Sequence, residues 1–256
     1  MQQQVKYTLV GNNKIIEYPD KILFIKKRTS YNIEDVYKYL DDHLVDNYLR
    51  PIEITNSELI FPYIEKTSLT DDEISKRLVL NLAIWQNKTT TYRTINLDEV
   101  KEFYESKKKE INYLYAYYHD LILQLESKVY YLPVEYLFLR NSSLINNQLN
   151  LANQLLEEWY SIVKTKERER LVYSHGKCSL DHFLPKDDGY FISLENAHLG
   201  RVTDDIEYLF RKNFSTIDLV TTYNLYQRKY PYSVEEKLLL FVKLAIPDKI
   251  NIYPSS

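Results

Sequence analysis

The stretch Tyr173-Ser174-His175-Gly176-Lys177-Cys178-Ser179-Leu180-Asp181-His182-Phe183-Leu184 is followed, after a short spacer, by Tyr190-Phe191-Ile192-Ser193-Leu194-Glu195-Asn196-Ala197-His198-Leu199-Gly200. Two apolar runs in this region, 171–173 and 190–192, are typical of short strands. The polar residues between and behind them therefore belong to a loop-rich segment. The helical periodicity on both sides of the segment stops there.

The chain before this segment begins with strand patterns around one helix. The turn triplet Gly11-Asn12-Asn13 predicts a first hairpin. A helix is expected from a cap at Ser30 or Asn32 to about Asn47, with Leu44 on its apolar face. The expected strands and the extended connector that follows them are Val5–Val10, Lys14–Tyr18, Ile22–Ile25, Ile52–Ile54, Leu59–Phe61 and Pro62–Glu65.

Beyond this connector the pattern becomes helical. Thr70 and the acidic residues after it predict a helix start. Further helices are expected at 97–125, 146–164, 204–212 and 234–245, and Trp85 and Trp159 lie on apolar helix faces. The pattern predicts a β-rich lobe with a hinge at residues 1–65 and a helical lobe at residues 66–256.

Composition excludes several classes of protein. The 256 residues include only 4 glycines, too few for a glycine-rich dinucleotide fingerprint or a Walker-type phosphate loop. A formal net charge of -3 gives no basic excess for nucleic acid or for an anionic membrane. One cysteine, Cys178, cannot form an internal disulfide, and no apolar run approaches the length of a membrane span. We therefore expect a soluble, most simply cytoplasmic protein with no nucleic-acid or membrane partner.

The two loops resemble the catalytic and metal-binding loops of the aminoglycoside phosphotransferase and choline kinase family, including its spore-coat-type bacterial branch. That family reads H-G-D-x-H-x-x-N-x-L, then I-D-W/F-E-x-A-x-x-G, then an Asp that starts a helix. The residues that match are His175, Gly176, Phe183, Leu184, Ile192, Glu195, Ala197, Gly200 and Asp205. The resemblance implies an α+β, two-lobed protein-kinase-like fold, with a small antiparallel β lobe carrying one helix and a larger, mainly helical lobe.

The sequence departs from the family where the chemistry takes place. Lys177 stands at the family's catalytic Asp, His182 at its metal-binding Asn and Ser193 at its main metal-binding Asp. A lysine ammonium has no lone pair with which to accept a proton. Imidazole and a neutral hydroxyl are poor ligands for Mg²⁺, which prefers carboxylate and carbonyl oxygen. The usual phosphotransfer mechanism is therefore expected to be absent.

Two substitutes for the missing groups remain open. Asp181, His182 and Glu195 together offer ligands for a divalent ion, and Asp181 offers a displaced base. Alternatively, Glu195 is an element of the fold and Asp181 caps a turn or helix. In that case Lys177 mimics the missing cation by pairing with Glu195 or Asp181.

The small lobe carries the nucleotide-binding positions that the resemblance implies. Lys26 or Lys27 ends a strand and is placed to contact phosphates, and Glu34 on the following helix is its expected partner. Phe61 and Tyr63 lie in the hinge, whose backbone groups would meet an adenine ring. No cofactor is expected unless nucleotide binding is retained, in which case the cofactors are ATP and Mg²⁺.

The sequence thus favours a degenerate phosphotransferase, a pseudokinase that binds an unidentified small molecule or protein partner without efficient phosphoryl transfer. Two alternatives remain. One is an active ATP-dependent small-molecule kinase that uses Asp181 and Glu195. The other is a structural or interaction protein of a spore-coat-type assembly.

Overall fold

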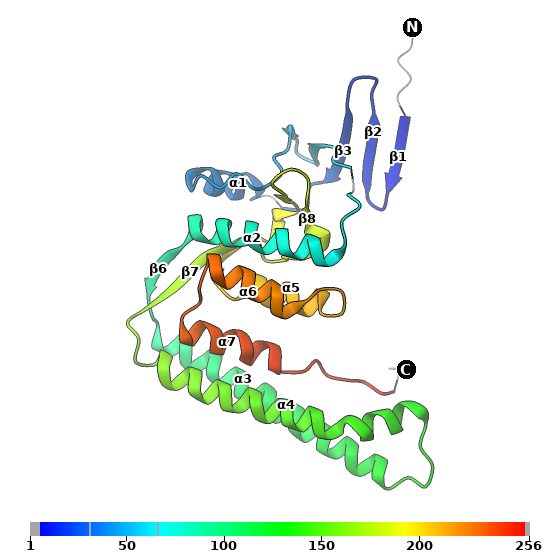
Figure 1. The fold of residues 1–256 in the computed structure, drawn as a ribbon, viewed down its shortest axis with the longest axis vertical. Helices are drawn as coiled ribbons and strands as arrows, with labels where there is room; N and C mark the ends of the chain where they lie inside the picture. The colour runs from blue at the N-terminus through cyan, green and yellow to red at the C-terminus, as the bar shows by residue number, and fades with distance from the viewer. Residues whose placement is uncertain (1–5, 31, 66, 254–256) are drawn as a thin grey trace. The chain divides into compact units, whose positions relative to one another are not determined.

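The computed structural model describes residues 6–30, 32–65 and 67–253. The chain divides into two compact units, shown in Figure 1. The first unit comprises Met1–Thr91 and Leu171–Pro231, and the second comprises Tyr92–Arg170 and Tyr232–Ser256. The boundary at residue 65 between a β-rich and a helical lobe is inferred from the change in sequence pattern, and it stays a prediction.

A five-stranded antiparallel sheet opens the first unit. Its strands are β1 (Lys6–Val10), β2 (Asn13–Glu17), β3 (Ile22–Lys27), β4 (Glu53–Ile54) and β5 (Glu58–Pro62), in the order β1-β2-β3-β5-β4. Val10 pairs with Asn13, so Gly11 and Asn12 alone form the first turn, and Gly11 supplies the positive φ of 58°. The predicted hairpin is therefore confirmed, although Val5 lies outside the described residues.

Helix α1 (Ile33–Asp42) belongs to the same unit and buries Ile33, Val36 and Leu40 in it. It ends before the expected Asn47, and Leu44 is 78% exposed, so the prediction for Leu44 was wrong. The Leu44 N–H donates to the Asp41 carbonyl and the Val45 N–H to the Leu40 carbonyl, both at 2.9 Å. These two bonds close the helix in a Schellman-type cap with Leu44 at the left-handed position (φ 56°) that glycine usually takes.

Helix α2 (Asp71–Thr89) begins at the predicted cap. The Thr70 side chain accepts the Glu73 N–H, and the Glu73 carboxylate accepts the Thr70 N–H, which makes a capping box. Trp85 is fully buried, and its indole N–H donates to the Tyr173 carbonyl, so its expected place in the core is confirmed. Helices α5 (Asp204–Asn213) and α6 (Leu219–Lys229) complete the helical part of the first unit.

The loop-rich segment forms short elements between α4 (Pro133–Val163) and α5 along the chain. These are β7 (Arg168–Ser174), η1 (Leu180–His182), β8 (Phe183–Leu184), β9 (Tyr190–Phe191), η2 (Leu194–Asn196) and β10 (His198–Arg201). Strand β10 pairs with β7 and β8 pairs with β9, both antiparallel. These pairings bring the two quoted stretches of sequence side by side. Strand β6 (Thr91–Thr94) lies on the other side of β7.

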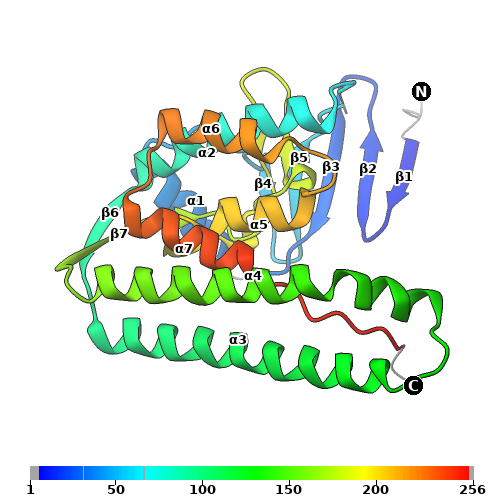
Figure 2. The same ribbon diagram turned by 60° about the horizontal axis from the view of Figure 1, so that its bottom comes forward.

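The second unit is a long helical hairpin with a third helix packed on it. Figure 2 shows α3 (Leu97–Glu126) and α4 (Pro133–Val163) side by side, with α7 (Val234–Ala245) against α4. Its core includes Trp159, as expected. Helix α4 begins at Pro133, well before the predicted start at residue 146, with proline in the first turn where its missing N–H costs no hydrogen bond. Among the described residues, no helix is both long and apolar enough to cross a membrane.

Candidate functional site

Asp205 anchors the first loop of the candidate site from the first turn of α5. Its side chain is fully buried, and its carboxylate accepts the backbone N–H of His175 at 2.9 Å and of Gly176 at 3.0 Å. Burial raises the pKa of Asp205, and the two N–H bonds act in the opposite direction. The loop that follows β7 is thereby fixed to the start of a helix 30 residues further along the chain.

His175 joins the two loops and is fully buried. Its Nδ1 accepts the Lys177 N–H at 3.3 Å, so its Nε2 carries the proton and donates to the Ile192 carbonyl at 2.9 Å. Burial is the main reason that the pKa of His175 falls to about 4. The ring is therefore neutral at physiological pH and holds the loops together from inside the protein.

The close contact between the two loops explains why position 176, next to His175, is a glycine. Its φ is 79°, and a Cβ added here would lie 2.2 Å from the Asn196 carbonyl oxygen. The backbones of the two loops touch at this point, which excludes any side chain.

Lys26 reaches into the second loop from β3. Its ammonium lies 2.6 Å from Glu195 Oε1 and donates to Ser193 Oγ at 3.0 Å. The two charged side chains are only 22% and 11% exposed. Ser193 adopts a left-handed conformation, with φ 64°, which is unusual for a residue with a side chain. The ion pair therefore occupies the position at which the resemblance implies metal-binding residues.

Tyr37 on α1 lies near the same ion pair. Burial is the first cause of its raised pKa, and the charge of Glu195 is the second. This tyrosine keeps its proton throughout the physiological range. Sequence reasoning did not assign Tyr37 to the site, because an aromatic residue on the apolar face of a helix carries no signal of its own.

The contacts of Glu34, Lys27 and Lys177 differ from those that the sequence predicts. Glu34 pairs with Arg28 at 2.5 Å and not with Lys26, because Arg28 lies at the end of β3, next to the start of α1. Lys27 is exposed, since successive residues of a strand point to opposite faces. Lys177 is also exposed, and the cation that pairs with Glu195 is Lys26.

The predicted metal positions do not fit a magnesium ion. Glu195 and Ser193 are engaged by the Lys26 ammonium, whose charge repels a cation. The Nδ1–H of His182 donates to the Lys177 carbonyl at 2.7 Å, and Asp181 is exposed on η1. Within residues 6–30, 32–65 and 67–253, no three His, Cys, Asp or Glu side chains are placed to hold a metal ion together.

The hinge offers fewer backbone groups than the sequence suggested. The Tyr63 N–H donates to the Ile22 carbonyl at 3.0 Å, which extends the sheet, and Pro62 has no N–H. Phe61 is buried and lies directly opposite Phe24, which shares a sheet face with Lys26. Two aromatic side chains thus lie on the face where the resemblance would place a nucleotide base.

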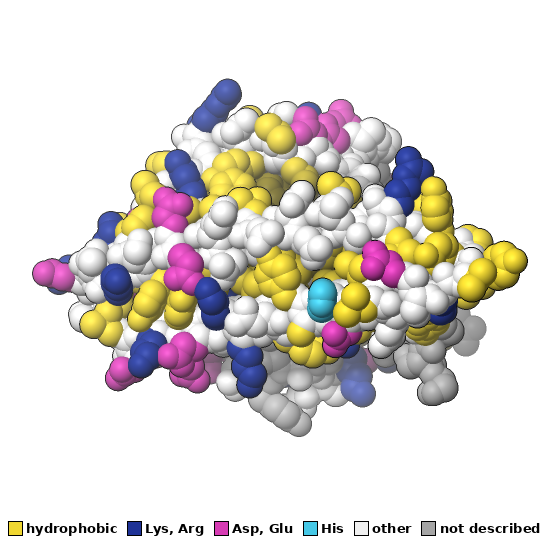
Figure 3. Space-filling view, turned by 90° about the horizontal axis from the view of Figure 1, so that it is seen from below, with side chains coloured by type: hydrophobic (Ala, Val, Ile, Leu, Met, Phe, Trp, Pro, Cys, Tyr) yellow, Lys and Arg dark blue, Asp and Glu magenta, His cyan; other side chains and the backbone are white. Residues whose placement is uncertain are grey.

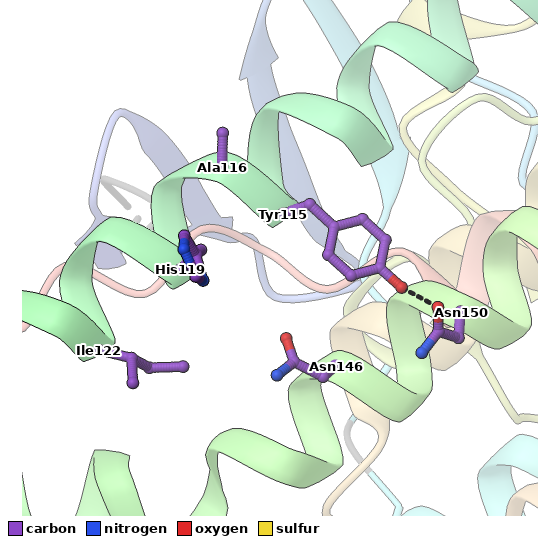
Figure 4. Close-up of a pocket in the computed structure, with 6 residues that line it drawn as sticks. All are labelled: Tyr115, Ala116, His119, Ile122, Asn146 and Asn150. Carbon is purple, nitrogen blue, oxygen red and sulfur yellow. Dashed lines mark hydrogen bonds between the residues drawn. The ribbon is translucent and has the colours of Figure 1, made fainter.

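A separate groove of about 490 Å³ lies in the second unit. Figure 4 shows its six lining residues on α3 and α4: Tyr115, Ala116, His119, Ile122, Asn146 and Asn150. The Tyr115 hydroxyl donates to Asn150 Oδ1. The groove brings one histidine and two amides together without a carboxylate or a thiol, so its lining shows no acid–base pair or nucleophile.

Solved structures that superpose on this chain include aminoglycoside phosphotransferases. An aminoglycoside phosphotransferase from Alicyclobacillus acidocaldarius superposes with a TM-score of 0.67 at 11% identity, covering 96% of this chain and 80% of that chain. The AMP-bound complex of spectinomycin phosphotransferase APH(9)-Ia gives a TM-score of 0.57 at 14% identity, covering 92% and 79%. A choline/ethanolamine kinase family protein from Mesorhizobium loti gives 0.50 at 10%, covering 96% and 76%.

No protein-family model and no curated protein matches the chain. The structural similarities therefore show the fold, and they confirm the α+β kinase-like class predicted from the two loops.

Proposed function

We propose that this chain, which has the fold of aminoglycoside phosphotransferases and choline/ethanolamine kinases, is a degenerate phosphotransferase that binds a ligand or protein partner without efficient phosphoryl transfer. The observation that carries the proposal is the ion pair of Lys26 with Glu195, closed by the bond to Ser193.

The proposal rests on what phosphoryl transfer requires. The reaction needs a metal ion that neutralises the phosphates and a carboxylate that orients the acceptor hydroxyl. Here an ammonium replaces the metal beside Glu195, and Lys177 stands where the base is expected. The same ion pair supports the fold, because it joins the sheet to the loop that follows β9.

The alternative of an active kinase with Asp181 and Glu195 is less well supported. A metal ion on Glu195 would have to displace the Lys26 ammonium from a 2.6 Å contact. Asp181 is exposed on η1, where a carboxylate retains its hydration and gains nothing from a low dielectric.

The test measures nucleotide binding and turnover with and without metal. We expect Mg²⁺ or Mn²⁺ to leave the melting temperature in ATP unchanged and to produce no ATP turnover. A nucleotide present at about 100 times its dissociation constant adds roughly 2.7 kcal/mol to stability, so metal-dependent binding would be visible. Robust Mg²⁺-dependent turnover that Glu195→Ala abolishes would refute the proposal.

A gain-of-function variant makes the test sharper. Lys177→Asp, His182→Asn and Ser193→Asp together restore the three residue types that the family motifs carry. We expect this triple variant to acquire a Mg²⁺-dependent shift in melting temperature that the wild type lacks. A triple variant that still does not respond to metal would contradict the assignment of the lost activity to these three positions.

A further inference from the structure

Three exposed leucines form a stripe along α4. Leu137, Leu144 and Leu151 are 56%, 62% and 49% exposed and lie seven residues apart. Seven residues are nearly two turns of an α-helix, so the three side chains point the same way with a drift of roughly 20° per step. A soluble helix normally turns polar side chains outward, so this face is unusual for an uncovered surface.

The residues between the leucines complete a heptad pattern. Val134, Asn141 and Gln148 are exposed and lie three residues before each leucine in turn, which are the spacings of a coiled-coil seam. The core of the second unit uses other positions on the helix, among them Phe138 and Ile145. The stripe therefore lies beside the hairpin's own packing face and is not part of it.

We propose that a second copy of this chain covers the stripe, with α4 packed parallel to α4 of that copy around a two-fold axis. In such a pair each residue lies opposite its counterpart, so leucine meets leucine. Asn141 then lies opposite Asn141 of the second copy, and Gln148 lies opposite Gln148. The Asn141 amide donates one N–H to the Leu137 carbonyl at 2.7 Å, which leaves its other N–H and its oxygen for the same amide of the second copy. Gln148 carries both donors and an acceptor, so a pair of Gln148 amides satisfies itself. The six seam positions 134, 137, 141, 144, 148 and 151 carry no charge, so no like charges are brought together.

A partner with an apolar groove fits this face less well. The Gln148 amide, together with the oxygen and the second N–H of Asn141, would then be buried against hydrocarbon, where a polar group without a hydrogen bond costs free energy. A polar residue in one seam position is a known way to set the register and number of helices in a coiled coil. The amides within the stripe therefore favour an identical partner over an unrelated apolar one.

The apolar surface extends past the helix and increases the area available for pairing. The turn before α4 exposes Val129, Tyr130, Tyr131 and Leu132. Figure 3 shows apolar side chains gathered at the end of the molecule where α3 and α4 join. The seam from Val134 to Leu151 is roughly 26 Å long at 1.5 Å per residue. The six seam residues and the four turn residues make ten on each partner, which is a small interface beside the roughly 20 to 30 residues a side of a standard one.

The first test is the mass of the full chain by sedimentation equilibrium over a range of concentrations. We expect a dimer for the wild type and for Ser143→Glu, which changes the exposed residue next to the stripe. Leu144→Glu places two carboxylates face to face, and we expect it to raise the dissociation constant about 100-fold or more. A wild type that is monomeric at every concentration, or a dimer unaffected by Leu144→Glu, overturns the proposal.

The second test fixes the direction of the two helices. In a parallel, in-register pair Asn141→Cys and Gln148→Cys each put two thiols opposite each other, whereas an antiparallel pair brings at most one of these positions opposite itself, and the native Cys178 is buried and does not compete. We expect mild oxidation to cross-link both the Asn141→Cys and the Gln148→Cys dimers and to leave Ser143→Cys uncross-linked. A dimer in which Asn141→Cys or Gln148→Cys does not cross-link overturns the parallel arrangement. If Leu144→Glu lowers the melting temperature of a monomer instead, the stripe is covered within one chain and the proposal is wrong.

Discussion

Lys26→Met is the substitution that tests the candidate site most directly. Methionine keeps the length of the lysine stem and removes the ammonium, which leaves Glu195 charged and without its cation in a site where it is only 11% exposed. If the Lys26–Glu195 pair replaces a metal and supports the fold, the variant loses stability. If Lys26 instead serves to hold phosphates, the variant loses nucleotide binding and keeps its stability.

The magnitude follows from the burial of the pair. Removing one partner of a fully buried ion pair costs about 3–5 kcal/mol, whereas an exposed pair contributes about 0.2–1 kcal/mol. Lys26 and Glu195 are 22% and 11% exposed, so water screens them partly. We therefore expect a loss of about 2 kcal/mol, which lowers the melting temperature of a domain of this size by about 4–8 °C.

Tryptophan fluorescence can follow the unfolding of the first unit, which contains the Lys26–Glu195 pair. The chain has 2 tryptophans. Trp85 lies in the first unit and Trp159 in the second. A Trp159→Phe background makes the emission of Trp85 a reporter of the unit that contains the ion pair. A double-mutant cycle of Lys26→Met with Glu195→Gln then isolates the pairwise free energy.

A second ion pair on the same sheet serves as the matched control. Lys14 and Glu58 lie 2.8 Å apart with side chains 40% and 33% exposed, so their coupling should remain below about 1 kcal/mol. We expect the Lys26–Glu195 coupling to exceed it by at least about 1 kcal/mol. Equal couplings, or a Lys26→Met variant that is as stable as the wild type, would refute the reasoning.

Three further predictions concern contacts around the site and in the helical hairpin. Gly176→Ala should destabilise the first unit by about 2–3 kcal/mol in urea unfolding, because its Cβ meets the Asn196 carbonyl at 2.2 Å and its φ is 79°; an unchanged midpoint would show that the loops separate easily. The pKa of His175 is about 4 in the folded protein, against an ordinary value of 6.5 for histidine, so its contribution to stability is complete above pH 6.5 and declines as the pH falls toward 4. The difference in unfolding free energy between wild type and His175→Gln should therefore shrink by about 3 kcal/mol across that window, and a constant difference would mean that the ring is not buried. Lys128 is the first cause that lowers the pKa of Glu135 to about 2, so the Glu135 carboxyl should show no NMR titration between pH 6 and pH 3, whereas Lys128→Met should bring its midpoint into that range.

The loops of the site could be predicted from sequence because their constraints are local. Gly176 beside His175 marks a backbone that must approach another closely, and the structure shows this contact with Asn196. The partnership of Lys26 could not be predicted, since nothing in the spacing connects residues 167 positions apart. Sequence patterns identify each residue only separately, Lys26 as a phosphate contact and Glu195 as a metal position.

The predicted start of α4 and the predicted end of α1 were wrong because tertiary packing, and not the local propensity of the residues, decides where these helices begin and end. The N-terminal third of α4 contains Asn141, Ser142 and Ser143, which favour turns over helix. The structure continues the helix through them because Phe138 and Ile145 are buried on either side. At the end of α1, Leu44 takes a conformation that sequence rules reserve for glycine or asparagine.

The separation of Lys26 from its partners also has a consequence for synthesis of the protein. Ser193 follows Lys26 by 167 residues, and translation proceeds at about 5–20 residues per second. On the ribosome, strand β3 therefore waits roughly 8 to 33 s before the loop that neutralises Lys26 has been made. During that interval the nascent sheet carries an unpaired cation on the face that later closes over Ser193 and Glu195. A chain released before residue 193 would lack both partners of Lys26, the Ser193 hydroxyl and the Glu195 carboxylate.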